Sequence, residues 1–398
     1  MWDFGDGVIR TEDNYHTTHE YSASRYYTLK LTITLKDGTP LTSEQGVFVG
    51  PGTRYIQGHT IYGDEIWYSG GTYVIQGRIM VAQGGRLTIE PGAIVKFNKM
   101  ANGSLMGISV QGTLIADGTT DQPIVFTSVN DNSVEGATGD GTPAAGDWDA
   151  INFKSESANS VLRHVVVKYV GYTGSYNYGS GYDNNAGAIQ VYSSSVSIAN
   201  SEINTNKTGV YIKGASPTIL ASNILNNTGQ GIYLDGAGPS IRDSIIKSNT
   251  QEGIKCINGS LPTVEGNTFD GNLNYGLFNN DVTVIVNAQQ NDWGDPSGPY
   301  DPSDDCASGG WYNPSGLGDK VSDHVNYTPW EGEGWAVEIK GDVNGDTVVN
   351  LADAIVVLHI LSGIQIQFAV NPGADVDGDG KITMAEELFI LQKISGLR

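Results

Sequence analysis

Apolar and polar positions repeat with a fixed period between residues 196 and 280. Apolar residues alternate with polar ones in short runs such as Val-Ser-Ile-Ala and Gly-Ile-Tyr-Leu, which indicates strands and not helices. The runs recur at steps of 21, 22 and 23 residues, a period typical of a solenoid whose repeats bury their apolar faces against one another. We therefore predict coils of a parallel β-helix. The equivalent apolar positions are Ile198, Ile219, Ile241 and Val264, then Ile203, Ile224, Ile246 and Phe269.

Each repeat also carries an asparagine three residues after the second apolar position. Stacked asparagines can bond the side chains above and below them, so we predict an internal or turn ladder. Cys256 takes the place of an apolar residue in the repeat and is expected to point inward, whereas Cys306 lies in a Gly/Asp/Pro-rich loop, so a disulfide between them is not favoured. The asparagines are Asn206, Asn227, Asn249 and Asn272.

The first fifty residues have a different pattern. Residues 26–35 alternate as one strand, and a hairpin turn is expected at residues 36–38. The motif WDFGDG at residues 2–7, followed by His19-Glu20-Tyr21, resembles the second half of a PKD domain, an Ig-like β-sandwich. We expect the motif's two aromatic residues to be core and its aspartates to fix turns. The first strands of such a sandwich are expected to lie outside residues 1–50 or to come from another chain.

Residues 51–71 are predicted to be a connector and residues 72–330 the β-helix. The segments LTIEPGAIVKF (87–97) and GTLIADGTTDQPIVFTS (112–128) resemble the entry coils of secreted bacterial right-handed parallel β-helix proteins. Residues 321–330 resemble their closing segment. The resemblance implies the fold but no single activity, because this broad family includes lyases, hydrolases, epimerases and adhesins.

After a linker at residues 331–340, residues 341–398 contain two copies of a twelve-residue loop, 33 residues apart. Oxygen-bearing groups stand at positions 1, 3, 5, 7, 9 and 12 of each loop, which is the arrangement that Ca²⁺ requires. Each loop leads into an amphipathic helix, so we predict two calcium sites beside two helices. The ligands are Asp342, Asn344, Asp346, Val348 (carbonyl), Asn350 and Asp353 in the first loop, and Asp375, Asp377, Asp379, Lys381 (carbonyl), Thr383 and Glu386 in the second.

This duplicated segment resembles a type I dockerin. The resemblance implies that loop positions 10 and 11, with the paired helices, dock a cohesin, which is a β-sandwich module. These positions are Leu351, Ala352, Met384 and Ala385. Dockerins of cellulosomes usually carry polar residues there, so the apolar pairs favour a different sandwich partner. Such a partner could be a cohesin-like or PKD-like domain, including one on another copy of this chain.

Composition narrows the location and the partners. Lys+Arg number 22 and Asp+Glu number 44, a net charge of −22 that argues against nucleic acid and anionic membranes and favours divalent cations. No stretch is long and apolar enough to span a bilayer, and no secretory apolar region follows Met1. We expect an extracellular protein whose export signal is absent from this sequence.

Two features are candidate carbohydrate sites. Lys213, Asp235 and Lys255 fall near one column of outward positions, shared with Tyr211, Tyr233 and Asn279. The column contains no arginine and no pair of aspartates, as a catalytic site of this kind would require. A solvated face is therefore the simpler interpretation. An insertion at residues 171–186 could stack on sugar rings or pack on the solenoid's flank; its tyrosines are Tyr172, Tyr176, Tyr178 and Tyr182.

The sequence therefore predicts a mainly β, extracellular, calcium-binding structural protein. A rigid β-helix rod would associate through its PKD-like and dockerin-like ends, head to tail into filaments or a surface layer. Two alternatives stay open: a polysaccharide lyase or hydrolase anchored by its dockerin, and a sugar-binding adhesin.

Overall fold

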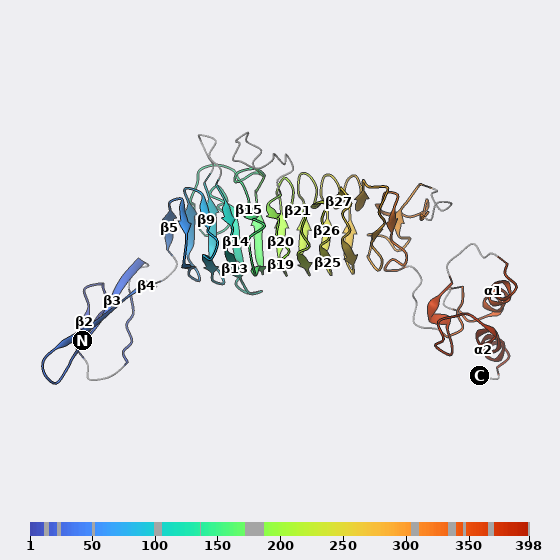
Figure 1. Ribbon diagram of the computed structural model, residues 1–398, viewed down its shortest axis with the longest axis horizontal. Coiled ribbons are helices and arrows are strands. Elements are labelled where there is room, and N and C mark those ends of the chain that lie inside the picture. The colour runs from blue at the N-terminus through green and yellow to red at the C-terminus, as the bar shows by residue number, and fades with distance from the viewer. Residues whose placement is uncertain are drawn as a thin grey trace.

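The computed structural model describes residues 1–11, 16–21, 25–49, 52–98, 106–135, 137–171, 187–303, 310–332, 340–344, 348–364 and 370–396. It contains a small antiparallel sheet, a long stack of parallel strands and a helix pair (Figure 1). None of the helices in these ranges is long and apolar enough to cross a membrane.

The N-terminal sheet has the strand order β2-β1-β3-β4. The predicted hairpin is present: β3 and β4 pair antiparallel over their full lengths. Its turn places Gly38 at a φ of 86°, which glycine adopts without steric cost, and the Asp37 carboxylate accepts the Thr39 N–H at 2.9 Å. The strands are β1 (Trp2–Asp3), β2 (Ile9–Arg10), β3 (Arg25–Thr34) and β4 (Pro40–Val49).

Aromatic rings form the core of this sheet. Phe4 is buried and stacks on His19 at 4.1 Å, and Tyr21 lies 4.1 Å from buried Tyr27. The Tyr21 hydroxyl donates to the Phe4 carbonyl at 3.1 Å. Asp6 accepts the Val8 N–H at 3.0 Å, as expected of a turn residue, and its hydrogen bond with His19 lowers its pKa. Phe4 and Asp6 therefore serve the local fold as expected, whereas Trp2 is only half-buried and is not a core residue.

Three parallel sheets form the β-helix, and each coil contributes one strand to each of them. The β5 sheet contains β5 (Thr53–Ile56), β8 (Thr72–Ile75), β11 (Ile94–Phe97), β14 (Ile124–Ser128), β17 (Val165–Lys168), β20 (Glu202–Asn204), β23 (Asn223–Leu225), β26 (Ile245–Lys247) and β29 (Thr268–Asp270). The β6 sheet contains β6 (His59–Ile61), β9 (Ile79–Val81), β12 (Ile108–Val110), β15 (Ile151–Phe153), β18 (Ile189–Val191), β21 (Val210–Lys213), β24 (Ile232–Asp235), β27 (Ile254–Ile257) and β30 (Leu277–Asn279). The β7 sheet contains β7 (Asp64–Trp67), β10 (Arg86–Ile89), β13 (Thr113–Asp117), β16 (Ser160–Arg163), β19 (Val196–Ala199), β22 (Thr218–Leu220), β25 (Ser240–Arg242), β28 (Thr263–Glu265), β31 (Val286–Asn287) and β34 (Val325–Asn326). A short pair, β32 (Pro299–Tyr300) and β33 (Gly318–Lys320), lies near the end of the stack.

The prediction of a connector at residues 51–71 is wrong. Strands β5, β6 and β7 form a complete coil there, paired in parallel with β8, β9 and β10. Ile61 and Trp67 point into the core, and Trp67 stacks on Tyr73 at 5.1 Å. These strands have only three or four residues each, and they lie before the stretch in which a fixed period recurs, so neither alternation nor periodicity reveals them in the sequence.

The predicted interior positions are confirmed. Ile198, Ile219 and Ile241 are fully buried and stack in register on Val264, and the column from Ile203 to Phe269 does the same. Each such side chain contributes about 1.5–3 kcal/mol on burial. The stack is therefore one continuous apolar core that neighbouring coils share.

The predicted asparagine ladder is also confirmed, at the corner between the β5 and β6 sheets. The Asn227 side-chain N–H donates to the Asn249 side-chain oxygen, and Asn249 donates to Asn272, each at 2.8 Å. The ladder ends on Asp319, whose carboxylate accepts the Asn272 side-chain N–H at 2.7 Å. Burial raises the pKa of Asp319, because its charge has lost water.

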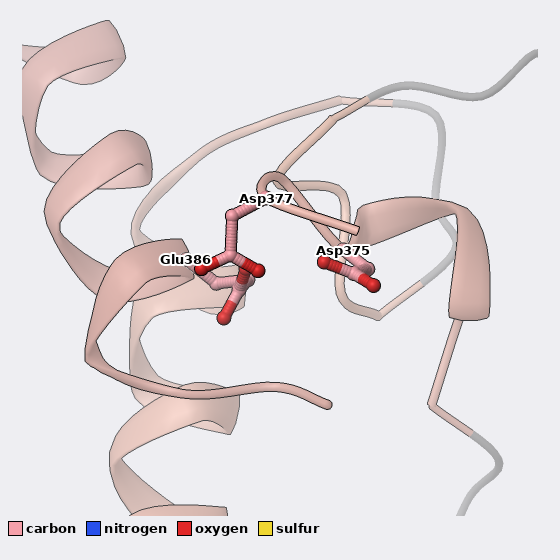
Figure 2. A group of neighbouring side chains, drawn as sticks. All are labelled: Asp375, Asp377 and Glu386. Carbon is pink, nitrogen blue, oxygen red and sulfur yellow. The ribbon is translucent and has the colours of Figure 1, made fainter. Parts of the chain in front are cut away.

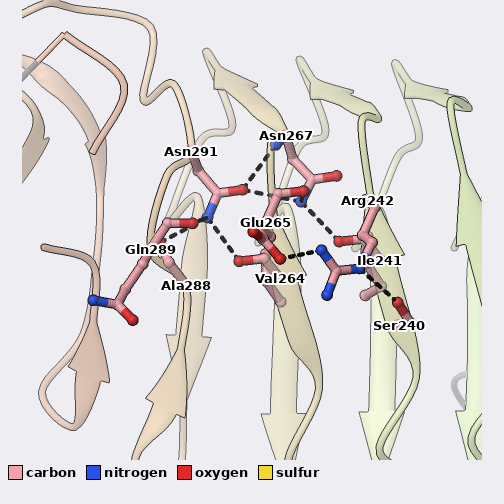
Figure 3. Close-up of polar contacts among 9 residues, drawn as sticks. All are labelled: Ser240, Ile241, Arg242, Val264, Glu265, Asn267, Ala288, Gln289 and Asn291. Carbon is pink, nitrogen blue, oxygen red and sulfur yellow. Dashed lines mark hydrogen bonds and ion pairs between the residues drawn. The ribbon is translucent and has the colours of Figure 1, made fainter. Parts of the chain in front are cut away.

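A second ladder, not predicted from the sequence, runs along the corner between the β7 and β5 sheets (Figure 3). Asn267 donates to the Asn291 side-chain oxygen at 3.0 Å and to the Ile241 carbonyl at 2.9 Å. Beside it, Arg242 and Glu265 form an ion pair between adjacent coils. The preceding members are Ser201, Ser222 and Ser244. The backbone N–H of each donates to the side-chain oxygen of the next member, and that of Ser244 donates to Asn267.

Cys256 points into the core, as predicted, and is fully buried; Cys306 lies outside the described residues. Burial raises the pKa of the Cys256 thiol to about 12. In a Cys306→Ser background, we expect Cys256 to resist a thiol reagent at pH 8 until the coils unfold, because the reactive thiolate is scarce and shielded. Absorbance of the released product checks this in native buffer and in denaturant. Rapid stoichiometric labelling in native buffer would contradict the inward placement.

Candidate calcium and docking site

The C-terminal domain packs two helices, α1 (Leu351–Leu361) and α2 (Met384–Ile394), beside the short helix η2 (Pro372–Ala374). Both begin with a capping box: Asn350 accepts the Ala352 N–H at 2.7 Å, and Thr383 accepts the Ala385 N–H at 3.1 Å. The predicted loops therefore lead directly into helices. The core consists of Val343, Ala354, Val356, Val357, Ala374 and Ile390.

The carboxylates at loop position 12 fold each loop back onto its helix. Asp353 accepts the N–H groups of Val343 and Asn344 at 2.8 and 3.0 Å, and Glu386 accepts those of Val376 and Thr383 at 3.0 and 2.6 Å. Both carboxylates are fully buried side chains. This role explains why an acidic residue at position 12 matters for the loop as well as for an ion.

Three carboxylates of the second loop converge (Figure 2). One oxygen each from Asp375, Asp377 and Glu386 lie within 4.8 Å of one another. Two oxygens that bind one Ca²⁺ at 2.3–2.6 Å can be at most about 5 Å apart, so this donor set fits a calcium ion. Gly378 and Gly380 have φ values of 78° and 76°, which lets the loop curl around that point.

Backbone N–H donors lower the pKa of two of these carboxylates, Asp375 and Glu386. The pKa of Asp375 is lowered mainly by the N–H of Gly380, which it accepts at 2.8 Å. Burial by itself raises the pKa of Glu386, but the N–H groups of Val376 and Thr383 outweigh that effect and lower it overall. The second loop therefore presents concentrated negative charge at neutral pH.

The first loop is described only in part. Its ends meet, because Asp353 bonds the backbone of residues 343 and 344, and Asp342 is fully buried beside them. Asp346 lies outside the described residues. The ligand assignments in both loops therefore stay predictions, with the stronger geometric support in the second.

Both helices expose an apolar stripe. Leu351 and Met384, predicted to contact a partner, are 60% and 62% exposed; Ala352 is exposed and Ala385 is half-buried. Each stripe continues along its helix at the same relative positions, so the two are equivalent. The remaining members are Ile355, Leu358 and Leu361 on α1, and Leu388, Leu391 and Ile394 on α2.

The outward column of the β-helix is partly as predicted. Lys213 and Asp235 do meet, at 3.0 Å, and the Asp235 carboxylate also accepts the Tyr211 hydroxyl at 3.2 Å. Burial alone raises the pKa of Asp235, but these partners and Asn258 lower it overall. The expectation of a solvated face holds only in part: Lys213 is exposed and Asp235 and Lys255 are half-buried, whereas Tyr211 is 0% and Tyr233 9% exposed.

Asn279 does not join the ion pair of Lys213 and Asp235 in the part of the chain that the structure describes. Asn279 is buried and donates to the Val284 carbonyl at 2.9 Å, so it serves the closing turns of the stack. The tyrosines of the insertion fall outside the described residues: Tyr172, Tyr176, Tyr178 and Tyr182.

Comparison with protein families agrees with this architecture. Residues 175–289 match the family described as the right handed beta helix region, and residues 58–191 match the pectate-lyase like beta helix domain. Residues 340–395 match the dockerin type I domain. No curated protein and no solved structure matches the chain.

The chain thus contains β-helix domains and a dockerin type I domain, a combination that suggests an extracellular component of the cellulosome type. Dockerin type I domains bind calcium and cohesin partners. The dockerin match favours a cohesin as the partner. The apolar residues at loop positions 10 and 11 by themselves favour a different sandwich domain, such as a PKD-like domain or another copy of this chain. They do not include residues 1–57, so the PKD resemblance stays a prediction.

Proposed function

We propose that this protein is an extracellular β-helix rod that is held in an assembly by a calcium-loaded dockerin, which docks a cohesin-type β-sandwich through the apolar stripes of α1 and α2. Two calcium ions, one in each loop, would fix the helix pair in the docking geometry. The observation that carries the proposal is the pair of equivalent stripes beside the carboxylate cluster.

The stripes support docking because apolar side chains that stay exposed to water gain free energy when a partner covers them. Solvent-exposed faces of such helices are ordinarily polar, and contiguous apolar patches of several hundred Å² mark interaction sites. Leu358 and Leu391 lie at the middle of the two stripes, with exposures of 47% and 42%. Since an interface concentrates its energy near its centre, these two leucines are the expected anchors.

Substitution of both leucines tests the proposal. We expect Leu358→Asp with Leu391→Asp to weaken binding to a cohesin at least 100-fold, because each aspartate would be buried without a partner. Calorimetry against a panel of purified cohesins in calcium measures the loss. Leu220→Asp, at an exposed leucine on β22, is the matched control and should bind normally. The proposal fails if the native chain binds no cohesin, or if the double variant binds as the native chain does.

Self-assembly is the second candidate, and the open face of the N-terminal sheet favours it. Strand β4 is an edge strand, and Leu41 on it and Ile33 on β3 are 54% and 53% exposed. An unpaired edge with apolar neighbours can accept another chain. A contact between this sheet and the dockerin of a second copy would be heterologous and would not close, giving a fibre. Light scattering at high concentration tests this, and a monomer in both calcium and EDTA would contradict it.

A further inference from the structure

The first coil of the β-helix carries charged residues at inward positions that are apolar in the coil stacked on it. Residues in register on neighbouring parallel strands point to the same side of a sheet, and the second-coil partners of these charged residues are fully buried. Each of the three sheets contributes one such pair. The pairs are Arg54 with Tyr73 on the β5 sheet, His59 with Ile79 on the β6 sheet and Glu65 with Leu87 on the β7 sheet. Charges are costly inside a packed coil, so such a set is expected where one side of the coil faces water.

These charges lie at an end of the solenoid where the strand edges are open. Strands β5, β6 and β7 are the terminal members of their sheets, so no described strand pairs with their outer edges (Figure 1). Such edges present N–H and C=O groups that can accept another chain. The opposite end is covered by the closing segment: the Gly276 N–H donates to the Lys320 carbonyl at 2.8 Å, and buried Trp293 stacks on Phe269 at 4.6 Å. The two ends are therefore closed by different means.

Glu65 links the β7 side of the open end to the β6 side. Its carboxylate accepts the Trp67 indole N–H at 2.8 Å and contacts His59 Nε2 at 2.8 Å. The other ring nitrogen of His59 lies 3.0 Å from the Gln57 carbonyl oxygen. Both nitrogens thus face oxygens that can only accept, so both bonds form when the ring carries two protons and a positive charge. Burial by itself lowers the pKa of His59, but its bonds with Glu65 and Gln57 raise it overall.

Arg54 covers the aromatic part of the same end. Its guanidinium lies 5.7 Å from the centre of the Tyr73 ring, and Tyr73 stacks on Trp67 at 5.1 Å. Tyr73 is 0% and Trp67 1% exposed, although they belong to the first two coils. The side chains of His59 and Glu65 keep 38% and 31% of their surface in water. Arg54, His59 and Glu65, which we call the charged lid, thus shield the apolar interior while two of them stay hydrated.

We propose that the charged lid prevents two copies of the chain from stacking end to end through their first coils. With apolar residues at the three positions, each end would offer an apolar interior framed by open strand edges, and a second copy related by a two-fold axis would match it. With the lid in place, the same contact must strip water from three charges of each copy, and no new partner offsets that cost. The contact needs no calcium and stops at two copies, so the inference is independent of docking through the helix stripes.

Replacing the lid by apolar residues, as in the second coil, tests the proposal. We expect the triple variant to dimerise at least about 100-fold more tightly than the native chain, as measured by sedimentation equilibrium of the full chain. The triple variant is Arg54→Leu, His59→Ile and Glu65→Leu. The matched control also removes two bases and one acid, from the flanks of inner coils, and should associate as the native chain does. The control variant is Arg163→Leu, Lys247→Leu and Asp117→Leu.

Every chain in this comparison also carries Leu358→Asp and Leu391→Asp, so that contacts through the helix stripes do not contribute. Hydrogen exchange places the contact: backbone amides of residues 53–67 should gain protection in the dimer, and those of β21 to β27 should not. A triple variant that is folded by circular dichroism and associates no more tightly than the native chain overturns the proposal, as does a dimer whose new protection lies elsewhere. If the triple variant does not fold, Arg54→Leu with Glu65→Leu carries the test at about pH 8, where His59 without its carboxylate is neutral, and roughly tenfold tighter association is expected.

Discussion

Removal of calcium is expected to unfold the C-terminal helix pair while the β-helix stays folded. The reason is the carboxylate cluster of Asp375, Asp377 and Glu386, whose oxygens lie within 4.8 Å of one another. Without a cation their like charges repel at short range. A core as small as that of this domain supplies only about 3–5 kcal/mol, and loss of calcium present at 100 times its dissociation constant removes about 2.7 kcal/mol for each site.

Calorimetry of the full chain measures this effect, because the two domains should melt in separate transitions. EDTA should lower the melting temperature of the helix pair, or abolish its transition, and leave that of the β-helix unchanged. Circular dichroism identifies the helix-pair transition, because only that one loses the helical signal. Glu386→Gln should weaken calcium binding at least 100-fold, since it removes a charge and loosens the loop that Glu386 closes. Asp270→Asn, at a half-buried carboxylate on β29, is the control and should leave calcium binding unchanged. A helix pair that melts identically in calcium and EDTA would show that the loops do not depend on the ion.

The sequence predicts this fold well wherever residue type repeats with position. The columns from Ile203 to Phe269 and from Asn206 to Asn272 keep their chemistry over four coils, so periodicity reveals them. The ladder that ends at Asn291 begins with serines, and this change of residue type conceals it. The first coil is missed for another reason: it lies before the stretch in which a fixed period recurs, and its strands of three or four residues show no alternation by themselves.

The sites show a different limit. Alternation identifies the side chains that leave the core, but it does not reveal what covers them, which is why Tyr211 is buried on an outward position. On α1, the apolar residues extend around both faces, so the sequence cannot decide whether Val357 or Leu358 is core. The structure resolves this: Val357 is fully buried and Leu358 is exposed. The electrostatic influence of Arg78 on Asp149 joins residues 71 positions apart in different coils, which no local pattern encodes.

Asn249→Ala is expected to be the most destabilising single substitution in the regular coils, at about 3–6 kcal/mol. The Asn249 side chain is fully buried and accepts the side-chain and backbone N–H groups of Asn227, at 2.8 and 3.2 Å. It also donates to the Ile224 carbonyl at 3.1 Å and to Asn272 at 2.8 Å. Alanine would leave these groups buried without partners, and each unsatisfied group costs about 1–3 kcal/mol.

The damage should be concentrated near the substitution, because each coil of a solenoid contacts only its neighbours. Hydrogen exchange should therefore show lost protection at the backbone amides of residues 227 and 249 before those near β8, while urea unfolding gives the total free-energy change. Asn274→Ala, at an exposed asparagine two residues after the ladder member Asn272, is the control and should cost less than about 0.5 kcal/mol. Equal stabilities for the two variants would mean that the coils are held by apolar packing alone, and that the amide ladder sets only their register.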